Sequence, residues 1–156
     1  MTGSNEQEIG KLKRQLMTEY EIIDLGKLSY FLGMEFVSCE KGIFLHQKKY
    51  IIDVLKRFKM LECKPVSTPV NTIVKLQKNA TNEGVDSTLF RQLIGSLRYV
   101  FHSRPDIVYS VGVASRYIKV PKRTHMVAAK RIIRYLKGTI DWGILFPSTK
   151  GLELLS

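Results

Sequence analysis

The chain has 156 residues, of which 44% are hydrophobic and 25% are charged. This composition is too apolar for a disordered protein, and the length suffices to bury a core in one domain or two small lobes. No apolar run reaches the roughly 18 residues of a membrane helix, and the first residues do not resemble a signal peptide. Cys39 and Cys63 lack the spacing of a zinc site. We therefore expect reduced thiols, as in an intracellular protein. Since the chain also lacks a long apolar run, we expect no membrane partner.

The formal net charge is +11, and most of it comes from one segment. Residues 87–140 contain eleven basic side chains and a single acid, Asp106. The bases are Arg91, Arg98, Arg104, Arg116, Lys119, Lys122, Arg123, Lys130, Arg131, Arg134 and Lys137. A foldable segment with one sign of charge indicates a polyanionic partner, and we expect that partner to be nucleic acid.

The N-terminal third of the chain predicts a helix, a β-hairpin and a second helix. Apolar residues recur at helical spacing over 6–20, after polar residues that can cap a helix. Two β-prone runs, 29–37 and 43–45, flank a short turn that contains a glycine, which is typical of a hairpin. Residues 47–59 carry an apolar face opposite a lysine-rich face, as in an amphipathic helix.

The middle of the chain predicts a linker followed by three helices. Residues 62–86 lack periodicity and are rich in proline, asparagine and glycine, so we expect a linker between two lobes. The first helix then spans about 86–102. The second begins at Pro105 after a capping Ser103, and the third begins at a capping Thr124.

The C-terminal runs 142–146 and 152–155 predict a second hairpin. An isolated pair of strands is marginal in water, so we expect the chain alone to be weakly stable or prone to aggregate. The predicted fold class is α+β: a helix, a hairpin and a helix, then a linker, a three-helix lobe and a partial hairpin.

No constellation of residues in the sequence predicts catalysis. Two-metal nucleotidyl transfer needs carboxylates around Mg²⁺ ions about 4 Å apart, and the sequence contains neither Asp-Asp nor Asp-x-Asp. The closest acid pairs, Glu6/Glu8 and Glu19/Glu21, do not share a helix face. The three histidines fall in separate predicted elements. We therefore expect no catalytic residue, metal or cofactor in this chain.

Five short strings occur in an order and spacing that indicate a known family. They are YFLGME at 30–35, CKPVSTP at 63–69, LIGSLRY at 93–99, SRPDI at 103–107 and AAKRIIRYLKGT at 128–139. Together they resemble the reverse transcriptase of copia-type retrotransposon Pol polyproteins over essentially the whole chain. The resemblance implies an RNA-directed DNA polymerase whose Mg²⁺-binding Tyr-Val-Asp-Asp turn precedes residue 1 and whose ribonuclease H carboxylates follow residue 156. This chain alone should then be inactive.

The resemblance also implies a division into parts. Residues 1–61 would be the end of the palm, 62–86 a linker, 87–141 a helical thumb-like lobe, and 142–156 the first hairpin of the junction with ribonuclease H. The implied partners are an RNA–DNA or DNA primer–template duplex and the remaining palm, fingers and ribonuclease H parts of the polyprotein. The implied location is a cytoplasmic particle or the nucleus.

The resemblance places a primer-gripping hairpin at Tyr30, Phe31 and Gly33. A glycine would let a sugar–phosphate backbone approach closely, and the two rings would offer flat surfaces to sugars or bases. The alternative is a glycine needed for close strand packing beside ordinary core aromatics.

A polymerase thumb must hold duplex of any sequence, which it does by neutralising phosphates. The candidate side chains surround the end of one predicted helix and continue along the next: Arg116, Lys119, Arg123, Lys130, Arg134 and Lys137. The alternative is a solvated face without a partner. Arg104 and Asp106 differ, because they flank Pro105 and are expected to fix a helix corner by an ion pair. The helical tyrosines, at 99, 109, 117 and 135, are expected in the core.

Three functional hypotheses follow. The chain is a reverse transcriptase fragment, a non-catalytic nucleic-acid-binding module derived from a retrotransposon polyprotein, or a three-helix interaction domain with an incidental basic face. Salt-dependent binding to a duplex would separate the first two from the third.

Overall fold

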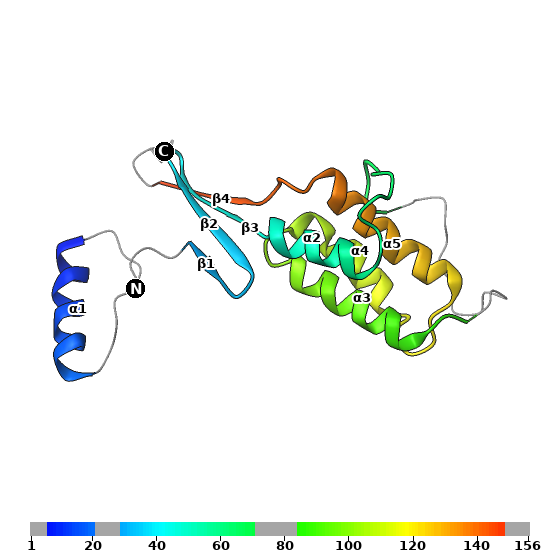
Figure 1. The fold of residues 1–156 in the computed structure, drawn as a ribbon, viewed down its shortest axis with the longest axis horizontal. Coiled ribbons are helices and arrows are strands. Elements are labelled where there is room, and N and C mark those ends of the chain that lie inside the picture. Colours follow the sequence, from blue (N-terminus) through cyan, green and yellow to red (C-terminus); the bar gives the residue numbers. More distant parts are fainter. Residues whose placement is uncertain (1–5, 21–28, 71–83, 149–156) are drawn as a thin grey trace, which may run out of the picture.

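The structure, a computed structural model, describes residues 6–20, 29–70 and 84–148. Those residues form five α-helices and one four-stranded antiparallel sheet (Figure 1), which confirms the predicted α+β class. The helices are α1 (Glu6–Glu19), α2 (Lys48–Arg57), α3 (Ser87–Val100), α4 (Val108–Ser115) and α5 (Arg123–Gly138), and a 3-10 helix, η1 (Pro105–Ile107), leads into α4. The strands are β1 (Tyr30–Phe31), β2 (Met34–Cys39), β3 (Gly42–His46) and β4 (Ile144–Pro147), in that order across the sheet.

The predicted hairpin is present, but its first strand is divided in two. Leu32 and Gly33 have φ angles of 48° and 72°, the positive values that a two-residue type I′ turn requires. β1 therefore folds back on β2, with Phe31 paired to Met34. The prediction of one strand over 29–37 was wrong because both halves are β-prone, and only the turn geometry separates them.

The predicted C-terminal hairpin is replaced by a different pairing. Most of strand β4 lies within the run 142–146, where a strand was predicted. However, β4 pairs antiparallel with β3 and not with a later strand of the chain. Gly42 makes the pairing fit, because a Cβ at this position would clash with the backbone oxygen of Phe146. The predicted second strand, 152–155, lies outside the described residues.

One hydrophobic core joins α2 to the three later helices. Ile51, Val54 and Leu55 of α2 are each 1% exposed and belong to the same buried cluster as the apolar faces of α3, α4 and α5. The apolar face predicted for 47–59 is thus confirmed. Helices on both sides of the predicted linker 62–86 share this one core and pack as one body (Figure 1). The boundary between two lobes at 62–86 stays a prediction.

The N-terminal helix α1 has the predicted extent but not a buried face. In Figure 1 it lies apart from the sheet and the helical body. Its apolar residues Leu12, Met17 and Tyr20 are 48, 51 and 61% exposed. The helical spacing therefore predicted the secondary structure correctly, while the amphipathic face remains uncovered by the described residues.

Two predicted helix caps are wrong, and a cap that was not predicted is present at Asp86. The carboxylate of Asp86 accepts the backbone N–H groups of Thr88 and Leu89 at 2.8 and 3.2 Å, so it caps α3 at the predicted start. Thr124 does not cap α5, because the helix already begins at the preceding residue. Ser103 does not cap η1, since its side chain is buried and donates to a side chain at the start of α2.

Candidate nucleic-acid interface

Four of the predicted phosphate contacts lie toward one end of the helical body. Arg116 follows the last turn of α4, Lys119 lies in the connection to α5, and Arg123 is the first residue of α5. Lys130 follows Arg123 by seven residues, two helical turns, and so shares its helix face. All four side chains are exposed, and none forms a hydrogen bond or ion pair with the described residues. We call these four residues the outer cations.

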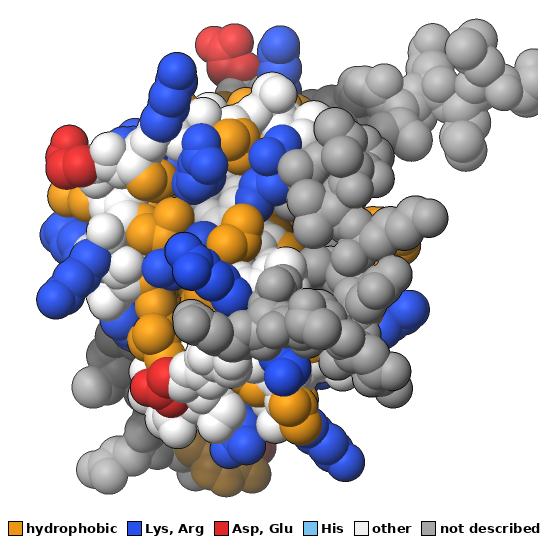
Figure 2. All heavy atoms as spheres, turned by 90° about the vertical axis from the view of Figure 1, so that its right-hand side faces the viewer, with side chains coloured by type: hydrophobic (Ala, Val, Ile, Leu, Met, Phe, Trp, Pro, Cys, Tyr) orange, Lys and Arg blue, Asp and Glu red, His pale blue; other side chains and the backbone are white. Residues whose placement is uncertain are grey.

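Figure 2 views the end of the body at which α5 begins. Lysine and arginine side chains spread over this face, with few acids between them. Charges of one sign that are not offset by neighbours raise the local concentration of oppositely charged partners. The surface can therefore attract a polyanion, and its chemistry does not read nucleotide sequence.

Two other predicted contacts, Arg134 and Lys137, already have partners inside the protein. Arg134 Nε donates to the carbonyl oxygen of Lys64 at 2.7 Å. Lys137 Nζ donates to the carbonyl oxygen of Cys63 at 2.8 Å. Both carbonyls belong to the conspicuous CKPVSTP string, which the sequence placed in a linker.

The segment 63–68, here called the strap, lies along the second half of α5. Arg131 Nε donates to the carbonyl oxygen of Thr68 in the strap at 3.1 Å. A terminal nitrogen of the same guanidinium donates to the Thr68 hydroxyl at 3.0 Å. In return, the N–H of Val66 donates to the carbonyl oxygen of Arg134 at 3.4 Å. Arg131, Arg134 and Lys137 are therefore the strap cations: they fix an irregular segment whose backbone oxygens would otherwise lack protein donors.

The predicted ion pair at the Pro105 corner is confirmed, and its arginine is buried whereas its aspartate reaches the surface. The side chain of Arg104 is 2% exposed and donates to both carboxylate oxygens of Asp106, at 2.9 and 2.6 Å. The same guanidinium donates to the carbonyl and hydroxyl oxygens of Thr139, at 2.8 and 2.7 Å. This planar fork ties the corner before α4 to the end of α5.

Tyr135 completes the cluster, because its hydroxyl donates to Asp106 Oδ2 at 2.7 Å. Burial raises the pKa of the Asp106 carboxyl, but the hydrogen bonds from Arg104 and Tyr135 outweigh burial and hold that pKa below its usual value. Burial, together with the bond to Asp106, raises the pKa of the Tyr135 hydroxyl. The cluster therefore holds an ionised carboxylate and a neutral phenol near neutral pH, as suits a structural contact.

The tyrosines predicted in the core differ in burial. Tyr135 is 6% exposed, as predicted, whereas Tyr109 is 73% exposed and the prediction for it was wrong. Tyr99 and Tyr117 are half-buried. Tyr117 stacks on the fully buried ring of His125 at a centroid distance of 3.8 Å.

The aromatic residues of the predicted primer grip are on the surface, whereas its glycine has an internal role. Tyr30 and Phe31 lie on the edge strand β1 and are 51 and 53% exposed, so they are not core residues. Lys49 Nζ lies 5.2 Å from the ring centroid of Tyr30. Gly33 packs on α3, where an added Cβ would lie 3.1 Å from the hydroxyl of Tyr99. The glycine thus serves its turn and a close approach to a helix.

The predicted residues do not form one continuous site. The β1–β2 turn lies at the end of the helical body next to the sheet, whereas α5 begins at the opposite end (Figure 1). α5 has 16 residues, and a helix of that size is about 24 Å long. Two candidate contact regions are therefore separated by roughly the length of this helix.

Sequence reasoning missed the residue that joins the sheet to the helices. Glu35 of β2 accepts the backbone N–H of Lys49 at 2.9 Å, at the start of α2, and lies 3.4 Å from His46 Nδ1. A carboxylate at a helix N-terminus satisfies an unpaired N–H and interacts favourably with the helix dipole. The sequence feature that could have indicated this role is a single acidic residue, Glu35, within an otherwise apolar, β-prone run.

A buried histidine and a buried glutamine also form contacts inside the fold, and of these two the glutamine was not predicted. His125 Nδ1 accepts the backbone N–H of Lys122 at 3.0 Å, which closes the first turn of α5. Gln47 Oε1 accepts the hydroxyl of Ser103 at 2.7 Å, across the junction of α2 and the Pro105 corner. Neither side chain is exposed, so both act inside the fold.

Within 6–20, 29–70 and 84–148, no group of three or more histidine, cysteine, aspartate or glutamate side chains is arranged to hold a metal ion. In the same ranges, no helix is both long and apolar enough to cross a membrane.

Several known proteins similar to this chain are retrotransposon Pol polyproteins. The sequence model of the family described as "Reverse transcriptase (RNA-dependent DNA polymerase)" matches residues 1–72. The Retrovirus-related Pol polyprotein from transposon RE1 of Arabidopsis thaliana is 36% identical over 154 residues, which cover 99% of this chain and 10% of that protein. The corresponding protein from transposon TNT 1-94 of Nicotiana tabacum is 38% identical over 148 residues, which cover 89% of this chain and 11% of that protein.

A further relative has a length closer to that of this chain. An uncharacterized mitochondrial protein of Arabidopsis thaliana is 37% identical over 155 residues, which cover 99% of this chain and 64% of that protein. No solved structure is significantly similar. The chain spans about a tenth of the length of the Pol polyproteins that it matches. These polyproteins align with nearly the whole chain and the reverse transcriptase family model matches its first 72 residues, so the chain is homologous to a segment of retrotransposon Pol polyproteins.

Proposed function

We propose that this chain holds a primer–template duplex as part of a retrotransposon reverse transcriptase, with the α3–α5 body as a thumb and the β1–β2 hairpin as a primer grip. The observation that supports this role is the set of outer cations, which are exposed and have no partner among the described residues. Such cations neutralise phosphates and release counterions, which gives affinity without sequence preference and with strong salt dependence.

The strap cations have a different role in this proposal. Each already donates to a strap oxygen, and a phosphate that took these donors would leave backbone carbonyls without partners. Arg134 and Lys137, which the sequence placed among the phosphate contacts, therefore act chiefly by holding the strap against α5. Phosphate binding belongs to the outer cations.

The separation of the two contact regions sets a minimum duplex length. The roughly 24 Å length of α5 corresponds to about seven base pairs at 3.4 Å each. A shorter duplex would reach the outer cations alone. A longer duplex would also reach the exposed rings of Tyr30 and Phe31.

Binding of the full chain to RNA–DNA duplexes of increasing length tests this proposal. Replacing Tyr30 and Phe31 by alanine should weaken binding about tenfold for a duplex of about twenty base pairs and leave a duplex of about six unchanged, because ring contacts contribute about 1–3 kcal/mol per base. Tyr20→Ala/Tyr109→Ala is the matched control, since these tyrosines are also largely exposed. Equal losses for both variants, equal losses at both lengths, or no binding at low salt would contradict the proposal.

A binding module without catalysis is the second candidate. It is favoured by the uncharacterized mitochondrial relative, 64% of which aligns with this chain although it is far shorter than a Pol polyprotein. The two candidates predict the same duplex binding. The coding sequence on either side separates them, because a polymerase requires the upstream Tyr-Val-Asp-Asp turn that the resemblance implies.

A further inference from the structure

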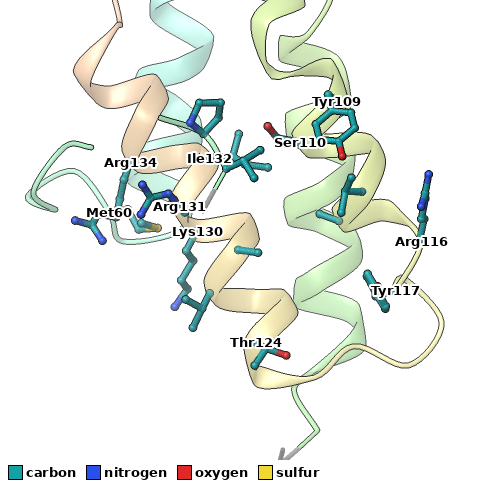
Figure 3. A pocket seen from close by; sticks show the side chains of 16 residues that line it. Met60, Tyr109, Ser110, Arg116, Tyr117, Thr124, Lys130, Arg131, Ile132 and Arg134 are labelled. Carbon is teal, nitrogen blue, oxygen red and sulfur yellow. The ribbon is translucent and has the colours of Figure 1, made fainter. Parts of the chain in front are cut away.

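A groove between α4 and α5 combines apolar and basic surfaces. Its volume is about 750 Å³, and Met60, Pro69 and Val70 bound it on a third side (Figure 3). Pockets that hold a ligand or an anchoring side chain are typically about 300–1,000 Å³. The groove is therefore large enough to receive several side chains of a partner.

The floor of the groove is aliphatic. Val113 and Ala114 of α4 face Ala128 and Ile132 of α5 across it. The two alanines leave the space between the helices unfilled. At the edge, Val127 is 59% exposed. An apolar surface of this kind, left open and ringed by charge, is typical of a site for another macromolecule.

The rim of the groove is basic, and none of the described residues that line it is acidic. The rim side chains are Arg116, Lys130, Arg131 and Arg134. Arg131 and Arg134 are already oriented by their bonds to the strap, and a guanidinium has five N–H donors, so each keeps donors for a second partner. A rim that is fixed before binding loses less side-chain entropy when it binds.

We propose that this groove binds an acidic peptide segment, which inserts apolar side chains between α4 and α5 and places its carboxylates against the basic rim. The four rim cations require an anionic partner, and the aliphatic floor selects one with apolar side chains. A nucleobase finds few partners for its polar edge, because apart from the rim cations the polar groups of the groove are the hydroxyls of Tyr109, Ser110, Tyr117 and Thr124, and an unpaired base edge is costly to bury. A helical segment in a groove between two helices is a recurrent mode of peptide recognition.

Defined peptides test this proposal on the full chain. The probe is a fluorescein-labelled peptide of about twelve residues, three helical turns, with glutamates on one face and leucines at i, i+3, i+4 and i+7 on the other. The control peptide has the same composition with the leucines spread around the helix. Fluorescence anisotropy should show saturable binding of the patterned peptide and about tenfold weaker binding of the control, because only the first presents continuous apolar anchors.

Paired variants locate the site. Val127→Glu should weaken the patterned peptide about tenfold, whereas Val120→Glu should change its affinity less than about twofold. The pair is matched, because Val120 is 67% exposed and lies outside the groove. Circular dichroism confirms that both variants fold. Equal losses for the two variants, or equal binding of the two peptides, would overturn the proposal.

An oligothymidylate of matched charge distinguishes a peptide site from a nucleic-acid site. Its affinity should fall equally for Val127→Glu and Val120→Glu, since both add one negative charge to the chain. If only Val127→Glu weakens the oligonucleotide, the groove holds nucleic acid and the peptide proposal is wrong. Failure of duplex binding would not affect this inference, which depends only on the groove.

Discussion

Two sets of cations on the same helical body have different surroundings, although their charges and helical spacing are alike. The outer cations are exposed and form no hydrogen bond or ion pair with the described residues. The strap cations share a face of α5 with two of them, yet each donates to a carbonyl oxygen of the strap. A cation with an internal acceptor contributes to the fold with some of its donors, whereas a cation without one has all its donors available to a partner. Charge patterning alone does not separate these roles.

Arg104 is the extreme case of an internal cation, because it is buried and its counter-charge is Asp106. Asp106→Asn should lower the free energy of unfolding by about 3 kcal/mol, since it leaves the guanidinium buried without a compensating charge. Urea denaturation measures this loss. Asp53→Asn, which removes an exposed carboxylate of α2, should change stability by less than about 0.5 kcal/mol. Similar values for the two variants would mean that this ion pair does not stabilise the fold.

The same substitution changes the response to acid. The pKa of Asp106 is lower in the folded chain than its usual value, so its contribution is fully present above about pH 4 and is lost as the pH falls through the folded-state pKa. The stabilities of the unmodified chain and Asp106→Asn should therefore converge as the pH falls. A constant difference down to the lowest pH at which the chain folds would contradict this linkage.

Removing the strap cations should have the next largest effect. Replacing all three by alanine should lower the free energy of unfolding by about 2 kcal/mol, because their hydrogen bonds contribute about 0.5–1.5 kcal/mol each at most. Cleavage within the strap by a protease of broad specificity should become faster as the strap detaches. The matched control replaces Lys119, Arg123 and Lys130, which removes the same charge and should change stability by less than about 0.5 kcal/mol. Equal destabilisation by both triple variants would contradict the division into two sets.

Much of the helical structure could be predicted from the sequence, because helix periodicity and caps are local. The apolar face of α2 and the start of α3 near Asp86 were found in this way. The ion pair at the Pro105 corner was also predictable, since its two charges flank the proline. Local patterns carried this information because the interacting groups lie within a few residues of each other.

The remaining features depend on contacts between distant parts of the chain. The pairing of β4 with β3 and the bond from Lys49 to Glu35 join segments that no local pattern relates. The strap looked like a linker because its order comes from cations of α5, about seventy positions away for Lys64 and Arg134. For the candidate site, the basic face could be predicted from the sequence. The hydrogen bonds from Arg134 and Lys137 to the strap could not.

The salt dependence of duplex binding tests most directly which cations contact phosphate. The full chain and the two triple variants are titrated with one RNA–DNA duplex over a range of salt concentrations, with the folded fraction followed by circular dichroism. Each phosphate contact contributes about 0.9 to the slope of log affinity against log salt concentration. Loss of Lys119, Arg123 and Lys130 should lower that slope by about three units, whereas loss of the strap cations should lower it by less than about one. Equal changes in slope, or a larger change for the strap cations, would contradict the assignment of phosphate binding to the outer cations.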